Sequence, residues 1–96
     1  MQVLFLVGDV THNKTIASGT FQNISSVGSA SRPVVLGKKR IFGKQKDSET
    51  EYNVPADVEW SHEDFLDEVG PPFRKLHFGV TLPSRGVRIL LRLQEP

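Results

Sequence analysis

The chain of 96 residues contains no cysteine, only one methionine, one tryptophan and one tyrosine, and no long hydrophobic run. The lack of cysteine excludes disulfides, thiolate metal sites and cysteine nucleophiles, and it leaves the redox compartment undetermined. No segment approaches the roughly 20 apolar residues of a membrane-spanning helix. The apolar opening, residues 1–7, has no basic segment before it and ends at Gly8, so it does not fit a secretion signal. We therefore expect no membrane partner and a cytoplasmic or otherwise intracellular location.

The apolar content is sufficient for one core. Hydrophobic residues make up 38% of the chain, and phenylalanine supplies six of its eight aromatic side chains. This composition excludes a chain that is disordered throughout, and the length fits one domain. We expect a single domain over residues 1–96. Mobile loops are predicted near residues 24–32, which are rich in serine, and near residues 43–53, which are highly charged.

Several segments predict strands. Residues 3–7 are continuously apolar, which indicates a central strand covered on both faces, and residues 15–21 follow turn residues as an antiparallel partner. Residues 33–36 resume a strand that residues 38–42 continue past a bulge. Residues 54–60 predict a short strand at an edge, because Pro55 cannot donate a ladder hydrogen bond.

A helix over residues 62–69 has the clearest local signal. Ser61 is a predicted N-cap, and the carboxylate of Asp64 can reach back to it as in a capping box. Trp60 and Phe65 occupy the two positions of a hydrophobic staple. A glycine followed by two prolines then ends the helix.

The last third of the chain predicts a hairpin. Aliphatic side chains alternate with polar ones in residues 76–82 and 87–93, and residues 83–86 have turn chemistry. Such a hairpin has one apolar face and one basic face. Together the elements predict a mainly β (β-rich α+β) protein, a small antiparallel sandwich or partly open barrel with one short helix near residues 62–69.

The formal net charge is only +1, yet the charges are separated along the chain. Residues 1–46 hold seven lysines and arginines against one acid, residues 47–68 hold nine acids and no lysine or arginine, and residues 69–96 hold five cations against one acid. Separation of this kind creates opposed local fields although the total is near zero.

The cations form a predicted basic stripe around one aromatic residue. Such an array could neutralise phosphates while the phenylalanine stacks on an unpaired base. The alternative is a solvated loop together with the ordinary polar face of a sheet. The nucleic-acid-binding candidates are Lys38, Lys39, Arg40, Phe42, Lys44, Lys46, Lys75, His77, Arg88 and Arg92.

The acidic block allows two interpretations. Its oxygen ligands could hold Mg²⁺ or Ca²⁺ together with His62, but their spacing fits no EF-hand loop. Acidic residues in the first turn of a helix are also explained without a metal, because they interact favourably with the helix dipole. We prefer electrostatic pairing with the basic segments, within the monomer or between subunits, and we predict no metal and no cofactor. The protein-interface candidates are Asp57, Glu59, Glu63, Asp67 and Glu68.

The sequence contains no G-x-S-x-G nucleophile motif, no H-E-x-x-H zinc motif and no glycine-rich phosphate-binding loop. It therefore carries no catalytic motif of these kinds. One short stretch, residues 28–36 with Arg32-Pro33 followed by Val34, Val35 and Leu36, resembles the loop-to-strand segment of MazF-type endoribonuclease toxins, small barrels that cut single-stranded RNA. The resemblance covers about a tenth of the chain and implies a catalytic contribution from Arg32.

These observations favour a non-enzymatic binding or assembly module with a charge-segregated protein interface, encoded by a virus or mobile element. Self-association is expected, through an edge such as residues 54–60 or the C-terminal strand. The alternative is a nucleic-acid-binding protein or a small MazF-like ribonuclease that uses the basic stripe.

Overall fold

The computed structural model describes residues 2–22, 33–46, 49–70, 73, 74, 76 and 86–94. These residues form the strands β1 (Gln2–Asp9), β2 (Lys14–Gln22), β3 (Val34–Leu36), β4 (Lys39–Ile41), β5 (Gly43–Lys46), β6 (Glu49–Val54) and β7 (Val87–Gln94), and the helix α1 (His62–Val69). The predicted loop at residues 24–32 and the predicted strand over residues 76–82 lie outside the described residues, apart from Leu76.

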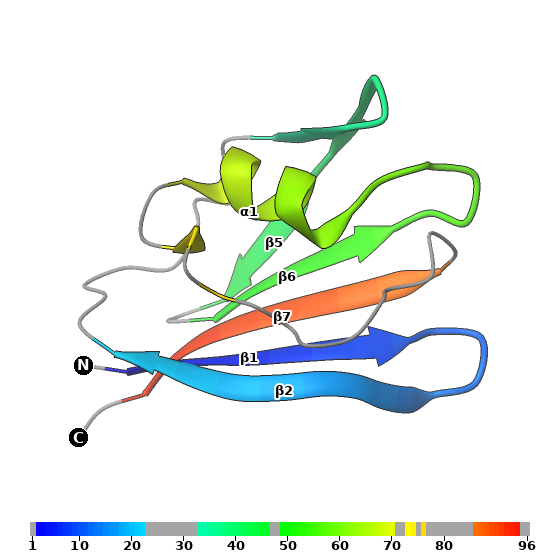
Figure 1. The fold of residues 1–96 in the computed structure, drawn as a ribbon. Coiled ribbons are helices and arrows are strands. Elements are labelled where there is room, and N and C mark those ends of the chain that lie inside the picture. The colour runs from blue at the N-terminus through cyan, green and yellow to red at the C-terminus, as the bar shows by residue number, and fades with distance from the viewer. Residues whose placement is uncertain are drawn as a thin grey trace.

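Five strands form one open antiparallel sheet in the order β2-β1-β7-β6-β5, and β3 and β4 form a separate hairpin. Figure 1 shows α1 and the β3-β4 hairpin on the same side of this sheet. We call that side of the sheet its inner face and the opposite side its outer face. The prediction of a mainly β protein with one short helix is confirmed, and the sheet is open rather than closed into a barrel.

The core lies between the inner face and the layer formed by α1 and the hairpin. Alternate residues of the central strands point into it, as the period of two in a pleated strand requires. The helix and the hairpin close it from the other side. The buried side chains include Val3, Phe5 and Val7 of β1, Tyr52 and Val54 of β6, Val87, Ile89 and Leu91 of β7, Phe65 and Leu66 of α1, and Val34, Leu36 and Ile41 of the hairpin.

Strand β1 is central, but the prediction that both its faces are covered is wrong. Its burial alternates, and Leu4 and Leu6 remain partly exposed on the outer face. Leu6 lies opposite Leu90 of β7, which is also partly exposed. The apolar run of residues 3–7 therefore does not indicate two covered faces. An antiparallel sheet can have one solvated face, and the neighbouring leucines of β1 and β7 on that face are only partly buried.

A mobile loop was expected near residues 43–53, but residues 43–46 form β5 and residues 49–53 belong to β6. Thr50 and Tyr52 are fully buried, whereas Glu49 and Glu51 alternate with them on the other face. Glutamates and lysines at every second position give the segment a loop-like composition. The charge density thus conceals the alternation typical of a strand with one buried face.

The expected strand over residues 54–60 is also wrong, because β6 ends at Val54. A turn follows, in which the amide of Val58 donates to the carbonyl of Pro55 at 3.2 Å. The C-terminal strand is confirmed as β7, but it lies between β1 and β6. Neither segment is an edge, so neither can pair with a second copy as proposed from the sequence.

Residues 33–42 reverse direction instead of continuing past a bulge. Gly37 and Lys38 have φ values of 53° and 67°, the left-handed pair that joins two strands in a tight hairpin turn. The strands β3 and β4 pair on either side of this turn.

The helix agrees with its sequence signals. The Ser61 hydroxyl accepts from the amide of Asp64 at 3.2 Å, and the Asp64 carboxylate accepts from the amide of Ser61 at 3.3 Å, so the capping box is confirmed. The rings of Trp60 and Phe65 meet edge to face with centroids 6.3 Å apart. This contact confirms the staple, which fixes the direction in which the chain enters α1.

Burial raises the pKa of Tyr52, the single tyrosine of the chain. The free phenol has a pKa near 10, so the unfolded chain releases this proton first as the pH rises. We therefore expect the free energy of unfolding to fall as the pH rises above about 10, because the folded state retains a proton that the unfolded state has lost. The phenolate absorbance should titrate above the ordinary value in the folded protein and return to it in urea. A titration at the same pH in both states would contradict the burial of Tyr52.

Candidate functional site

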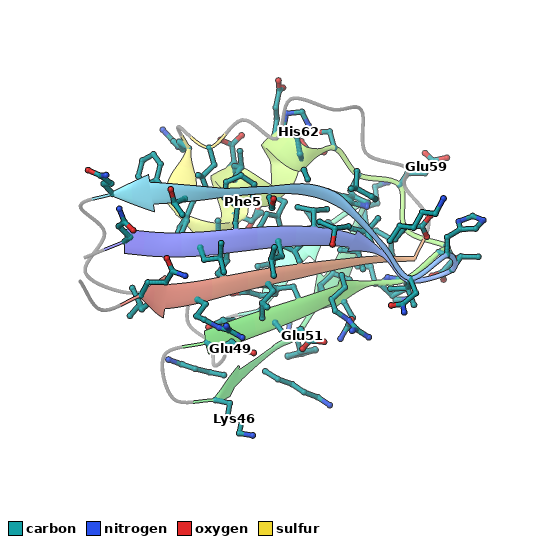
Figure 2. All side chains as sticks on the ribbon, turned by 90° about the horizontal axis from the view of Figure 1, so that it is seen from below. Phe5, Lys46, Glu49, Glu51, Glu59 and His62 are labelled. Carbon is teal, nitrogen blue, oxygen red and sulfur yellow. The ribbon has the colours of Figure 1, made fainter. Side chains whose placement is uncertain are left out.

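The outer face of the sheet carries rows of charge that cross the strands. Cross-strand pairing places Lys46 beside Glu49 and Glu49 beside Arg92, and it places Lys44 beside Glu51. Figure 2 looks onto this face, where Lys46, Glu49 and Glu51 extend from β5 and β6. The acids of β6 therefore stand between cations of β5 and β7.

The arginines of β7 are held by the acids of β6. Both Nη2 and Nε of Arg92 reach one carboxylate oxygen of Glu49, at 2.7 and 2.8 Å. Nε of Arg88 lies 3.2 Å from a carboxylate oxygen of Glu51 and donates to the side-chain oxygen of Asn53 at 3.3 Å. Exposed ion pairs of this kind contribute little stability, about 0–1 kcal/mol. They do, however, compensate the positive charge of the two arginines, which a phosphate group would otherwise bind.

Three further predicted residues, Lys39, Asp57 and Asp67, are paired in the layer above the sheet. Nζ of Lys39 contacts both carboxylate oxygens of Asp57 at 3.2 Å, which ties the hairpin to the turn after β6. Nε of Arg74 lies 3.7 Å from Asp67 of α1. Acidic and basic segments thus pair within the monomer at these positions.

Three of the predicted cations and one aromatic residue form what we call the basic ridge: Arg40, Phe42, Lys44 and Lys46. They alternate along the almost continuous extended segment of β4 and β5, and a pleated chain directs alternate residues to one side. All four are exposed. Within the described part of the chain, no hydrogen bond or ion pair engages their side chains. Lys38 adds another exposed cation at the nearby hairpin turn.

The remaining predicted residues are dispersed. Glu59 is exposed before the helix, and Glu63 and Glu68 are exposed on α1, with Asp67 beside them. No group of three or more histidine, aspartate or glutamate side chains in the described ranges has the geometry of a metal site. Lys75 and His77 of the basic stripe and Arg32 of the ribonuclease alternative lie outside the described residues.

The turn between β1 and β2 contains a small polar cluster. The Asp9 carboxylate accepts from the amide of Thr11 at 2.9 Å and contacts Nδ1 of His12 at 2.7 Å. The hydrogen bond with His12 is the main reason why the pKa of Asp9 lies below its ordinary value. A hollow of about 240 Å³ opens beside this turn and reaches Arg88 and Leu90. The contacts of Asp9 are those of a turn-stabilising aspartate, which accounts for the cluster without a ligand.

The two edges of the sheet differ in a way that sequence reasoning missed. The edge strand β5 carries Lys44 and Lys46, charged side chains of the kind that discourage pairing with another chain. The edge strand β2 has nine residues, and after Lys14 it contains no charged residue and no proline. In the described residues no strand pairs with its outer side. The absence of charge over residues 15–22 was the available signal, but it has meaning only once β2 is known to be an edge.

No family model, no curated protein and no solved structure matches the chain. The resemblance of residues 28–36 to MazF-type toxins therefore stays a prediction. No helix in the described ranges is long and apolar enough to cross a membrane.

Proposed function

We propose that the protein is a non-enzymatic assembly module that self-associates through the outer edge of β2. The observation that carries this proposal is the contrast between the two edges. On its outer side β2 has no paired strand among the described residues, and after Lys14 it carries no charge and no proline. Such an edge presents backbone amides and carbonyls that a second strand can bind. The other edge carries lysines at alternate positions.

The sequence of β2 suits pairing with itself. A two-fold axis would bring two copies of β2 together antiparallel, and the two sheets would become one continuous sheet. Lys14 is the only charged residue of β2 and lies at its first position, so it would face the neutral far end of the partner strand. The exposed Ser18 and Thr20 supply hydroxyls for cross-strand contacts. No repulsion between like charges opposes this arrangement.

The other arrangement is the charge-segregated interface expected from the sequence, in which the acidic block of one subunit pairs with the basic segments of another. Salt distinguishes the two. Edge pairing depends on backbone hydrogen bonds and persists at high salt, whereas an interface between exposed charges weakens as the ionic strength rises.

Sedimentation equilibrium at several protein concentrations, at low and at high salt, tests the proposal. We expect a dimer in both conditions. Thr20→Lys should weaken dimerisation about tenfold or more, because it places a charge within the neutral part of each paired edge. Gln45→Lys is the matched control, since it adds the same charge to the exposed edge strand β5 and should leave dimerisation unchanged.

A monomer at every concentration and in both salt conditions would overturn the proposal. A dimer that dissociates at high salt and is equally stable in both variants would instead support the charged interface and exclude pairing through β2.

A further inference from the structure

The exposure of Phe42 is unusual for its size. Its side chain is 66% exposed, and it is one of three large hydrophobic residues on the surface of the described ranges. A single exposed apolar residue needs no explanation on its own. Phe42, however, stands between Arg40 and Lys44, so an apolar ring and two cations share one strip of surface.

The cations that the structure describes on β4, β5 and β7 divide into two groups by their contacts. Lys39, Arg88 and Arg92 are compensated by carboxylates at 2.7–3.2 Å. Within the described part of the chain, the cations of the basic ridge form no ion pair. Lys44 and Lys46 stand opposite Glu51 and Glu49 in the strand register, but these two acids are bound by Arg88 and Arg92, so four cations share two acids. Among the described residues, the cations without an ion pair are therefore gathered near the exposed aromatic ring, apart from Lys14 on β2. Arg88 and Arg92, which the sequence also suggested as phosphate ligands, are already bound by acids.

We propose that the basic ridge binds single-stranded nucleic acid, with a base stacked on Phe42 and backbone phosphates held by Arg40, Lys44 and Lys46. Alternate residues of an extended chain are about 7 Å apart, so the ridge presents cations at regular intervals on both sides of the ring. Stacking platforms flanked by positive charge are the usual means of binding unpaired bases without sequence preference. This site is separate from the β2 edge and does not depend on dimerisation.

The ridge selects single strands over duplexes. A duplex keeps its bases stacked inside, so it can meet the lysines but gains nothing from the ring. Phe42 therefore adds affinity for an unpaired strand only. An acidic peptide would use the same cations, but it would not place an aromatic base on the ring.

Fluorescence anisotropy with labelled oligo(dT), oligo(U) and a DNA duplex tests the inference. We expect both single strands to bind at low salt more tightly than the duplex, with affinity falling as salt is added. Phe42→Ala should weaken single-strand binding about tenfold without changing the salt dependence, because it removes stacking and no charge.

The role of charge is tested by two substitutions that remove the same unit of charge. Lys44→Gln should lower the affinity and reduce the slope of log affinity against log salt by about 0.7, the value for one phosphate contact on a single strand. Lys14→Gln is the control, because Lys14 is exposed on β2, the opposite edge strand of the sheet, and it should change the slope much less. Circular dichroism of each variant checks that the fold is retained.

Three results would overturn the inference: no binding of either single strand at low salt, undiminished binding by Phe42→Ala, or equal losses for Lys44→Gln and Lys14→Gln. The last result would mean that the oligonucleotide responds to net charge and not to the ridge.

Discussion

Replacing Phe65 with alanine is expected to lower the free energy of unfolding by about 4 kcal/mol. The side chain is 1% exposed, and its ring meets Tyr52 edge to face with centroids 5.3 Å apart, in addition to the contact with Trp60. Removing it leaves a cavity between helix and sheet and ends both aromatic contacts. Because domains of this size are stable by only about 5–15 kcal/mol, the loss is a large fraction of the total.

Urea denaturation followed by far-ultraviolet circular dichroism measures this loss. Glu68→Ala is the matched control, because Glu68 is exposed on the same helix and its removal should change the stability by less than about 0.5 kcal/mol. Similar midpoints for the two variants would show that α1 does not pack on the sheet as described.

Replacing Gly37 with alanine is expected to lower the free energy of unfolding by about 3 kcal/mol. Its φ of 53° is unfavourable for any residue with a β-carbon, and a β-carbon built there would lie 2.5 Å from the carbonyl oxygen of Glu59. The hairpin or the segment before α1 must then move. Both cover the core, so the displacement would reach the buried Val58, which also lies close to this position.

The neighbouring residue provides the control for Gly37. Lys38 also has a positive φ, 67°, but as a residue that already carries a side chain. Lys38→Gly relieves the left-handed strain and at the same time makes the unfolded chain more flexible, and these effects nearly cancel. Thermal melts should therefore show a large decrease for Gly37→Ala and a small change for Lys38→Gly. A small change in both would contradict the close approach to Glu59.

The sequence predicted those elements whose signals are local. The helix was predicted with its bounds, because a capping box and a staple are defined within a few residues of Ser61. Strands β1, β2 and β7 were also expected from their patterns. The strand β6 was missed, since its buried Thr50 and Tyr52 alternate with glutamates whose partners, Arg92 and Arg88, lie about 40 residues further along the chain. Such pairing becomes visible only in the folded sheet.

The candidate surfaces depended on tertiary structure in the same way. Sequence reasoning grouped the cations into one stripe. In the folded sheet the acids of β6 bind Arg88 and Arg92, and in the described residues Arg40, Lys44 and Lys46 form no ion pair. Sequence reasoning also placed the edge at residues 54–60, because a proline there suits an edge strand. Strand order decides which strands are edges, and the sequence contains no local signal for strand order.

The order β2-β1-β7-β6-β5 has a consequence for how the protein is made. The β1-β2 and β5-β6 hairpins can each form early, but neither contacts the other until β7 is inserted between them. Two-stranded hairpins are marginally stable in water, and contacts between residues far apart in the chain slow folding. On the ribosome, the nascent chain should therefore remain sensitive to proteases until β7 has left the exit tunnel, and it should then become resistant in a single late step.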